Sequence, residues 1–172
     1  YLHLNNQGKR FMDEDIPGQN LTQMLCRQPV SDDPEKAAAD IRSYQIFDAA
    51  WPEQIINMPD GHGYTTHFVP EEEIDNYQLV LSGFGLGYTT QQMVEDAVDY
   101  KADTLEELVE MMGLPKETAL AEIERYNELC RNGFDEDFGK MPKRLYALEN
   151  PPFYGCAFSA SKYMLVMMGG LE

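Results

Sequence analysis

The spacing of hydrophobic and polar residues along this chain alternates between the period of a strand and the period of a helix. Aromatic and apolar residues alternate with polar ones over residues 1–5, and residues 9–12 follow an Asn-Gln-Gly turn. This pattern predicts a β-hairpin at the start of the chain. Further strands are predicted at residues 43–47, 76–82, 151–154 and 163–166.

Other segments carry the helical period. In residues 90–98 the apolar side chains recur on one helix face. Thr104 and Glu107 fit a capping box, in which a hydroxyl and a carboxylate three residues apart start a helix, and Gly113 suits its end. The next helix has an apolar stripe and stops at Gly133. Shorter helices are predicted at residues 21–25 and 51–57.

These elements predict an α+β fold, with helices packed on a small, mostly antiparallel sheet. The length of 172 residues is that of one domain, and the hydrophobic content of 43% is that of a folded protein. The net charge of −17 disfavours nucleic acid and anionic membrane surfaces as partners, because both repel it. We therefore interpret the charge as a solvated acidic surface.

Composition leaves the cellular compartment open. No stretch approaches the roughly 18 apolar residues of a spanning helix, and no segment has the pattern of a signal peptide. The cysteines Cys26, Cys130 and Cys156 lie far apart and are odd in number, which favours reduced structural thiols over a disulfide framework.

Candidate chemistry in the sequence is sparse. His62 and His67 are five residues apart in a glycine-rich stretch, so we predict no metal site, although either histidine could donate a proton or bind substrate. Residues 82–87 (SGFGLG) precede a predicted helix, but Tyr88 occupies the place of the final small residue of a dinucleotide-binding loop, so we interpret them as a flexible loop. We interpret residues 135–137 (DED) as a solvated turn.

Several short motifs occur in an order that is more informative than any one of them. They are residues 4–15 (LNNQGKRFMDED), 44–48 (YQIFD), 102–108 (ADTLEEL), 125–129 (RYNEL), 135–140 (DEDFGK), 151–154 (PPFY) and 168–171 (MGGL). Together they resemble the flavoprotein subunits of fumarate reductase and succinate dehydrogenase, in the branch with urocanate reductases and 3-ketosteroid dehydrogenases.

The resemblance implies that residues 1–172 are the capping domain of a larger protein, inserted between two halves of a flavin-binding domain. It implies FAD in the full-length protein, with the flavin-binding domain of the same polypeptide as the partner of this chain. Residues 167–172 then begin the return into that domain, and Met168, Gly169 and Gly170 approach the flavin. We expect this chain alone to hold no cofactor. The abrupt end after a Gly-Gly pair favours a chain that is part of a larger protein.

The same resemblance bears on the substrate. In fumarate reducers an arginine that donates a proton follows the hairpin, and its place falls on Gly18. A histidine that clamps a substrate carboxylate precedes the glycine pair, and its place falls on Val166. Both departures predict that the acceptor is a larger, less charged enone or enoate rather than fumarate. The alternative is a free-standing binding module that keeps the fold without the chemistry.

Overall fold

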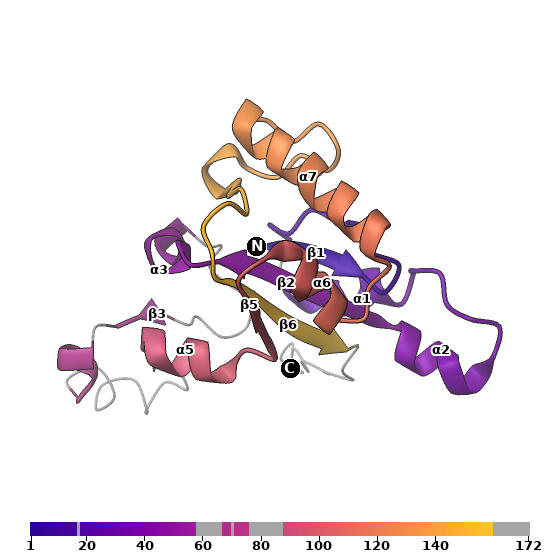
Figure 1. Ribbon diagram of the computed structural model, residues 1–172, viewed down its shortest axis with the longest axis horizontal. Helices are drawn as coiled ribbons and strands as arrows, with labels where there is room; N and C mark the ends of the chain where they lie inside the picture. The colour runs from indigo at the N-terminus through magenta and orange to yellow at the C-terminus, as the bar shows by residue number, and fades with distance from the viewer. Residues whose placement is uncertain (17, 58–66, 70, 76–87, 160–172) are drawn as a thin grey trace, which may run out of the picture.

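The computed structural model describes residues 1–16, 18–57, 67–69, 71–75 and 88–159 (Figure 1). A four-stranded antiparallel sheet is its centre, in the order β1 (Leu2–Asn5), β2 (Arg42–Asp48), β6 (Phe153–Ser159) and β5 (Tyr100–Ala102). The register pairs Leu2 with Ile46 and Asp48 with Phe153. A second, two-stranded sheet pairs β3 (His67–Phe68) with β4 (Tyr88–Thr89) in parallel.

The helices lie around this sheet, which confirms the predicted α+β class. They are α1 (Gly18–Leu25), α2 (Pro34–Asp40), α3 (Trp51–Gln54), α5 (Gln91–Ala97), α6 (Leu105–Met111) and α7 (Lys116–Asn132), with 3₁₀ turns η1 (Ile55–Asn57), η2 (Glu71–Glu73) and η4 (Pro142–Arg144). Thr104 caps α6 by accepting a hydrogen bond from the Glu107 amide at 3.2 Å. Gly133 ends α7 with a φ of 69°, as its sequence position predicts.

Some predicted strands differ from the structure. Residues 9–12 form a single bridge between Leu4 and Arg10 rather than a second strand. The alternation did not indicate β5, whose three residues are too few for a period to be seen. The strand predicted at residues 151–154 is β6, which begins two residues later. The strands predicted at residues 76–82 and 163–166 lie outside the described residues.

The main core lies between one face of the sheet and helices α6 and α7, which Figure 1 shows on the same side of it. Because side chains alternate along a strand, Leu2, Leu4 and Ile46 point to this face and are at most 1% exposed. Leu108 and Ile123 meet them from the two helices. The apolar stripe predicted for α7 is therefore its buried face.

A smaller aromatic cluster lies on the other face of the sheet. Phe47 stacks on Tyr154 with ring centroids 5.3 Å apart, and Trp51 contacts Phe47 edge-on. Val94 and Val98 pack against it from α5 and from the residues after it. Both faces of the sheet therefore bury side chains.

Buried polar side chains tie the long connection between α7 and β6 to the sheet. The Asp48 carboxylate is 1% exposed and accepts hydrogen bonds from the amides of Ala50, Glu149 and Asn150. The Asn127 side chain accepts from the Leu148 amide at 2.8 Å and donates to its carbonyl. These contacts set where β6 enters the sheet.

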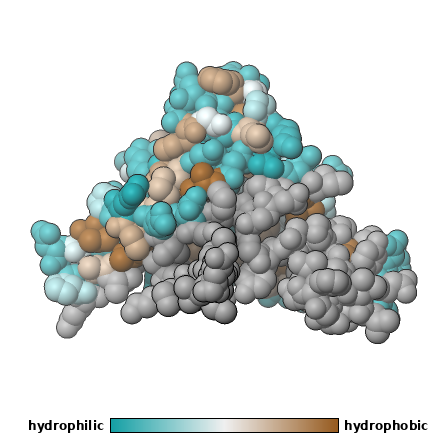
Figure 2. All heavy atoms as spheres, turned by 180° about the vertical axis from the view of Figure 1, so that it is seen from behind, coloured by the Kyte–Doolittle hydropathy of each residue, from teal (hydrophilic) through white to brown (hydrophobic). Residues whose placement is uncertain are grey.

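The described surface is mostly hydrophilic on the side that Figure 2 shows, in keeping with the charge of −17. Within the described residues, no helix combines the length and the apolar character that a bilayer crossing requires.

The hairpin turn generates a test of the fold. Gly8 has a φ of +73°, and a Cβ there would lie 3.0 Å from the Ala119 backbone nitrogen at the start of α7. Gly8→Ala therefore combines backbone strain of about 1–2 kcal/mol with overpacking of about 1–3 kcal/mol. Gly113→Ala is the matched control, because Gly113 has a φ of +68° and nothing within 4 Å of the added carbon. We expect urea unfolding to show a clearly larger loss for Gly8→Ala; equal losses would contradict the close packing of the turn on α7.

Candidate functional site

A buried ionic cluster forms where two of the sequence motifs meet. The Arg10 guanidinium lies between two carboxylates and contacts each through two nitrogens. Its Nε and Nη2 donate to Glu14 at 2.9 and 2.8 Å, and its Nη1 and Nη2 donate to Asp135 at 3.0 and 2.8 Å. The three side chains are at most 2% exposed. Two-pronged contacts of this kind are the strongest ion pairs that arginine makes.

Lys140 balances the charge of this cluster. Its ammonium lies 3.3 Å from Glu14 and donates to the Tyr126 hydroxyl at 3.1 Å. The Arg10 guanidinium also lies 5.0 Å from the ring centroid of Tyr126 and 4.9 Å from that of Phe138. Two cations thus meet two carboxylates between aromatic rings, so the buried charges are compensated. We call Arg10, Glu14, Tyr126, Asp135 and Lys140 the ionic cluster.

The local sequence after α7 explains how Asp135 reaches this position. Its carboxylate accepts hydrogen bonds from the amides of Asp137, Phe138 and Lys140. Gly139 supplies the positive φ of 81° that this tight turn requires. The interpretation of residues 135–137 as a solvated turn is therefore wrong for Asp135, which is 1% exposed. The other two residues of this segment, Glu136 and Asp137, are exposed, and both pair with Arg125 on the surface.

The two carboxylates of the cluster are ionised at neutral pH. Burial raises the pKa of Glu14, but the nearby Lys140 and Arg10 outweigh it and bring this pKa to about 2. Burial also raises the pKa of Asp135, but hydrogen bonds from Arg10 and the Lys140 amide outweigh this effect and lower the pKa to about 2. Burial raises the pKa of Tyr126 well above its usual range. Groups with such pKa values do not exchange protons near pH 7, so the cluster holds structure rather than shuttles protons.

The cluster fixes the loop that leads to α1. Glu14 accepts a further hydrogen bond from the His3 amide of β1 at 3.3 Å. The next residue, Asp15, accepts from the Met141 amide at 2.7 Å. Helix α1 begins at Gly18, three residues after Asp15. The start of α1 is thereby tied to the sheet and to the connection after α7.

The other sequence-predicted site residues are not gathered by the described structure. Val166, Met168, Gly169, Gly170 and His62 lie outside the described residues. His67 belongs to β3, where its backbone pairs with Tyr88. No group of three or more His, Cys, Asp and Glu side chains that could hold a metal ion occurs within the described part of the chain.

Sequence reasoning missed the physical role of the cluster. Arg10, Glu14 and Lys140 stand in motifs that marked the resemblance, but the two motifs are separated by 125 residues at the Arg10–Asp135 pair. The available signal was charge itself, because both motifs carry charged residues beside large apolar ones. Only the packed chain shows that these charges are buried together.

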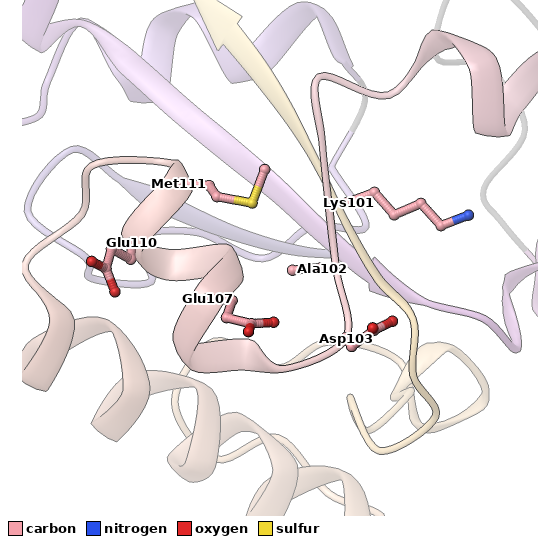
Figure 3. A pocket seen from close by; sticks show the side chains of 6 residues that line it. All are labelled: Lys101, Ala102, Asp103, Glu107, Glu110 and Met111. Atoms are coloured by element: carbon pink, nitrogen blue, oxygen red, sulfur yellow. The ribbon is translucent and has the colours of Figure 1, made fainter.

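A shallow hollow lies between β5 and α6, lined by Lys101, Ala102, Asp103, Glu107, Glu110 and Met111. Figure 3 shows its side chains spread over β5, the residue after it and α6, without convergence on one point. Three of its residues are carboxylates, which repel an anionic acceptor. The hollow is therefore a poor candidate for binding a substrate that carries a carboxylate.

A dinucleotide-binding site requires a parallel strand, a glycine loop and a helix that starts at the phosphates. The main sheet of the described residues is antiparallel instead. The glycine stretch at residues 82–87 lies outside the described residues. The main sheet therefore does not provide the parallel strand, loop and helix that hold the phosphates of FAD.

Comparison with known proteins now places this fold. The family model described as FAD binding domain matches residues 1–172. The chain belongs to this family of FAD-binding flavoproteins. Three curated relatives, all oxidoreductases by name, are much longer than this chain. The chain spans only 13% to 20% of their length.

Those relatives share different portions of the chain. Vinyl phenol reductase of Lactiplantibacillus plantarum is 40% identical over 73 residues, which are 42% of this chain and 14% of that protein. The 3-oxosteroid 1-dehydrogenase of Mycolicibacterium smegmatis is 30% identical over 135 residues, 78% of this chain and 20% of that protein. NADH:acrylate oxidoreductase of Vibrio harveyi is 26% identical over all 172 residues, 13% of that protein.

Solved structures share the fold. A solution structure of a fumarate reductase flavoprotein subunit from Lactobacillus plantarum matches 95% of this chain and 84% of its own, with a TM-score of 0.54 and 17% identity. The open conformation of a flavocytochrome c3 fumarate reductase matches 92% of this chain and 20% of its own, with a TM-score of 0.53 and 18% identity. This fold is thus that of fumarate reductase-like flavoproteins, as its motifs predict.

Removal of the central cation tests the cluster. Arg10→Met leaves Asp135 and Glu14 buried beside one remaining cation, and breaking a buried pair in this way costs about 3–5 kcal/mol. The matched control is Arg125→Met, since Arg125 also pairs with two carboxylates but is 39% exposed. Such surface pairs contribute about 0–1 kcal/mol. Chemical denaturation should separate the two variants by at least 2 kcal/mol, and similar losses would refute the buried network.

The lowered pKa values also predict a pH dependence. Glu14 and Asp135 titrate near pH 2 in the folded chain and near pH 4 when unfolded, so the unfolded state binds protons first as the pH falls. Their stabilisation, on the order of 2–3 kcal/mol each, is complete above about pH 5 and is lost towards pH 2. The stability gap between wild type and Glu14→Gln, measured by urea unfolding, should narrow over this range. A gap that stays constant from pH 6 to about pH 2 would show that Glu14 is not ionised in the fold.

Proposed function

We propose that this chain is the substrate-capping domain of an FAD-dependent oxidoreductase that reduces or desaturates an activated C=C bond. The observation that carries the proposal is a contrast. The flavin family matches the chain from end to end, yet the main sheet of the described residues is antiparallel, unlike the parallel sheet of a dinucleotide-binding domain. A flavin-binding domain of the same polypeptide then holds FAD, and this chain closes over the substrate.

The structural matches support a capping unit with its own fold. The same fold occupies 20% of the long flavocytochrome chain and 84% of the Lactobacillus plantarum chain. It is therefore found both as a minor part of a large flavoprotein and as most of a shorter polypeptide. An independently folded insertion behaves in this way, because it has a hydrophobic core of its own.

The relatives and the sequence support an acceptor other than fumarate. Relatives are named for a vinyl phenol, a 3-oxosteroid and acrylate, and none of these carries two carboxylates. Gly18 and Val166 stand where the resemblance places two groups that serve a dicarboxylate. A buried carboxylate that loses such a partner costs about 2–5 kcal/mol. The proposed acceptor is an enone, an enoate or an aryl-conjugated alkene.

FAD supplies the hydride chemistry when it is bound in the complete protein. The residues of this chain position the substrate and exclude water when the cap closes. Gly18 starts α1, at the position where the resemblance places the proton-donating arginine of fumarate reducers, so this chain brings no cation there. The ionic cluster keeps that helix start in place.

A turnover assay tests the proposal with the complete FAD-containing protein. We expect an apolar enone or enoate to be reduced, or its saturated form to be desaturated. Its kcat/KM should be at least about tenfold above that for fumarate, because a carboxylate without a partner costs more than the roughly 1.4 kcal/mol that a tenfold ratio requires. Gly18→Arg should narrow that preference, since it adds a cation at the helix start. A preference for fumarate in the unchanged protein would refute the proposed substrate class.

A flavin titration separates the capping domain from a free-standing module. The 172-residue chain alone should leave the absorbance and fluorescence of FAD unchanged, whereas the complete protein should bind FAD. A stoichiometric yellow complex of this chain would refute the division of labour. A complete protein that binds no FAD would favour the free-standing binding module.

A further inference from the structure

One arginine joins two parts of the fold that are distant in sequence. Arg144, in η4, donates from Nε to the Asn57 carbonyl at 2.6 Å. Its Nη1 lies 3.4 Å from Oδ1 of Asp15. The Arg144 and Asp15 side chains are only 13% and 11% exposed. The guanidinium thus bridges the loop before α1 to the end of η1.

Neighbouring contacts repeat the same connection. The Met141 amide donates to the other carboxylate oxygen of Asp15 at 2.7 Å. The Tyr146 hydroxyl donates to the Gln54 carbonyl of α3 at 3.3 Å. Residues 141–146 therefore lie as a strap across the loop on one side and α3 with η1 on the other. We call these six residues the strap.

The chemistry of the bridge requires an arginine. A guanidinium has several donors on a rigid plane and can serve two acceptors in different directions, whereas an ammonium acts as a single point charge. Asn57 offers a neutral carbonyl that accepts a hydrogen bond from the guanidinium, and Asp15 offers a carboxylate that it contacts as an ion pair at 3.4 Å. Lys143 is adjacent to Arg144 but is exposed.

The bridge lies close in the chain to the substrate-facing position. Only two residues separate Asp15 from Gly18, and three residue steps span at most about 10 Å. The position of Asp15 therefore limits where α1 can begin, because the two lie within this span of one another along the chain. Misplacement of a substrate-positioning element by about 1 Å can lower the rate by about a hundredfold.

We propose that Arg144 is a positioning residue that fixes the start of α1 relative to α3 and η1, and thereby sets the shape of the substrate-facing side of the cap. This inference rests on the proposed function for its catalytic consequence. Its structural part, the coupling of two separate segments by one side chain, stands on contacts between described residues alone.

Hydrogen exchange on the 172-residue chain tests the structural part without turnover. Arg144→Met should speed exchange at the amides of Asp15 and Ile16 and also in α3 and η1 by about tenfold or more, because both prongs are lost. Lys143→Met, the matched control, should change exchange less than about twofold. Arg144→Lys should restore protection on one side only. Faster exchange confined to the strap, or on one side alone in Arg144→Met, would overturn the proposal.

Steady-state kinetics on the complete FAD-containing protein test the catalytic part. Arg144→Met should lower kcat about 10- to 100-fold with unchanged FAD content, and Lys143→Met should not. Asp15→Asn keeps an oxygen acceptor for the Met141 amide but removes the charge that faces Arg144, so it should reproduce part of the loss. The double variant should lose no more than Arg144→Met alone; multiplied losses would show that the two residues act separately and overturn the proposal.

The two proposals fail in distinguishable ways. An unchanged protein with no alkene turnover refutes the proposed function, while hydrogen exchange still decides the coupling. Turnover in the unchanged protein together with an unaltered kcat in Arg144→Met refutes the positioning role and leaves the proposed function intact. If Arg144→Met does not fold, Asp15→Asn carries both readouts.

Discussion

The contact between the Arg10 guanidinium and the carboxylates of Glu14 and Asp135 is the constraint on which the rest of this structure depends. It joins the hairpin at the start of the chain to the turn after α7, and these segments have no backbone pairing with one another. A buried cation with two buried anions tolerates only one arrangement, since a displaced partner leaves an uncompensated charge in a medium of low dielectric. Lys140 supplies the second positive charge, so this interior is electrically balanced although the whole chain carries −17.

The connection between α7 and β6, which begins at this contact, also holds the loop before α1 and the end of β2. Asp135 shapes its first turn, Met141 and Arg144 hold Asp15, and Asp48 accepts the amides of Glu149 and Asn150 just before β6. The connection has little regular structure, but several of its backbone amides donate to the carboxylates of Asp15, Asp48 and Asp135. Hydrogen bonds of this kind satisfy backbone groups that no helix or sheet pairs.

The family and the fold assign different tasks to different parts of a protein. The chain belongs to a family of FAD-binding flavoproteins, whereas its main described sheet is antiparallel, and on this contrast the proposed function assigns flavin and substrate to different parts of the complete protein. The relatives named for uncharged or monoanionic substrates agree with Gly18 and Val166 as departures from a dicarboxylate site. In the proposed function this chain contributes the placement of α1 rather than an acid from the ionic cluster, since the pKa values of Glu14 and Asp135 are about 2.

The sequence by itself determined the elements with strong local signals. Thr104, Gly113 and Gly133 start or stop helices through their own backbone and hydroxyl chemistry, and residues 43–47 are predicted as a strand and lie in β2. It also determined the family through the order of its motifs. The tertiary structure alone decided that Asp135 is buried while Asp137 is exposed, that β5 joins the sheet, and that Arg144 bridges Asp15 and Asn57. The reason is physical: local patterns report how a residue relates to its neighbours along the chain, whereas the burial of a charge depends on partners that only folding brings within reach.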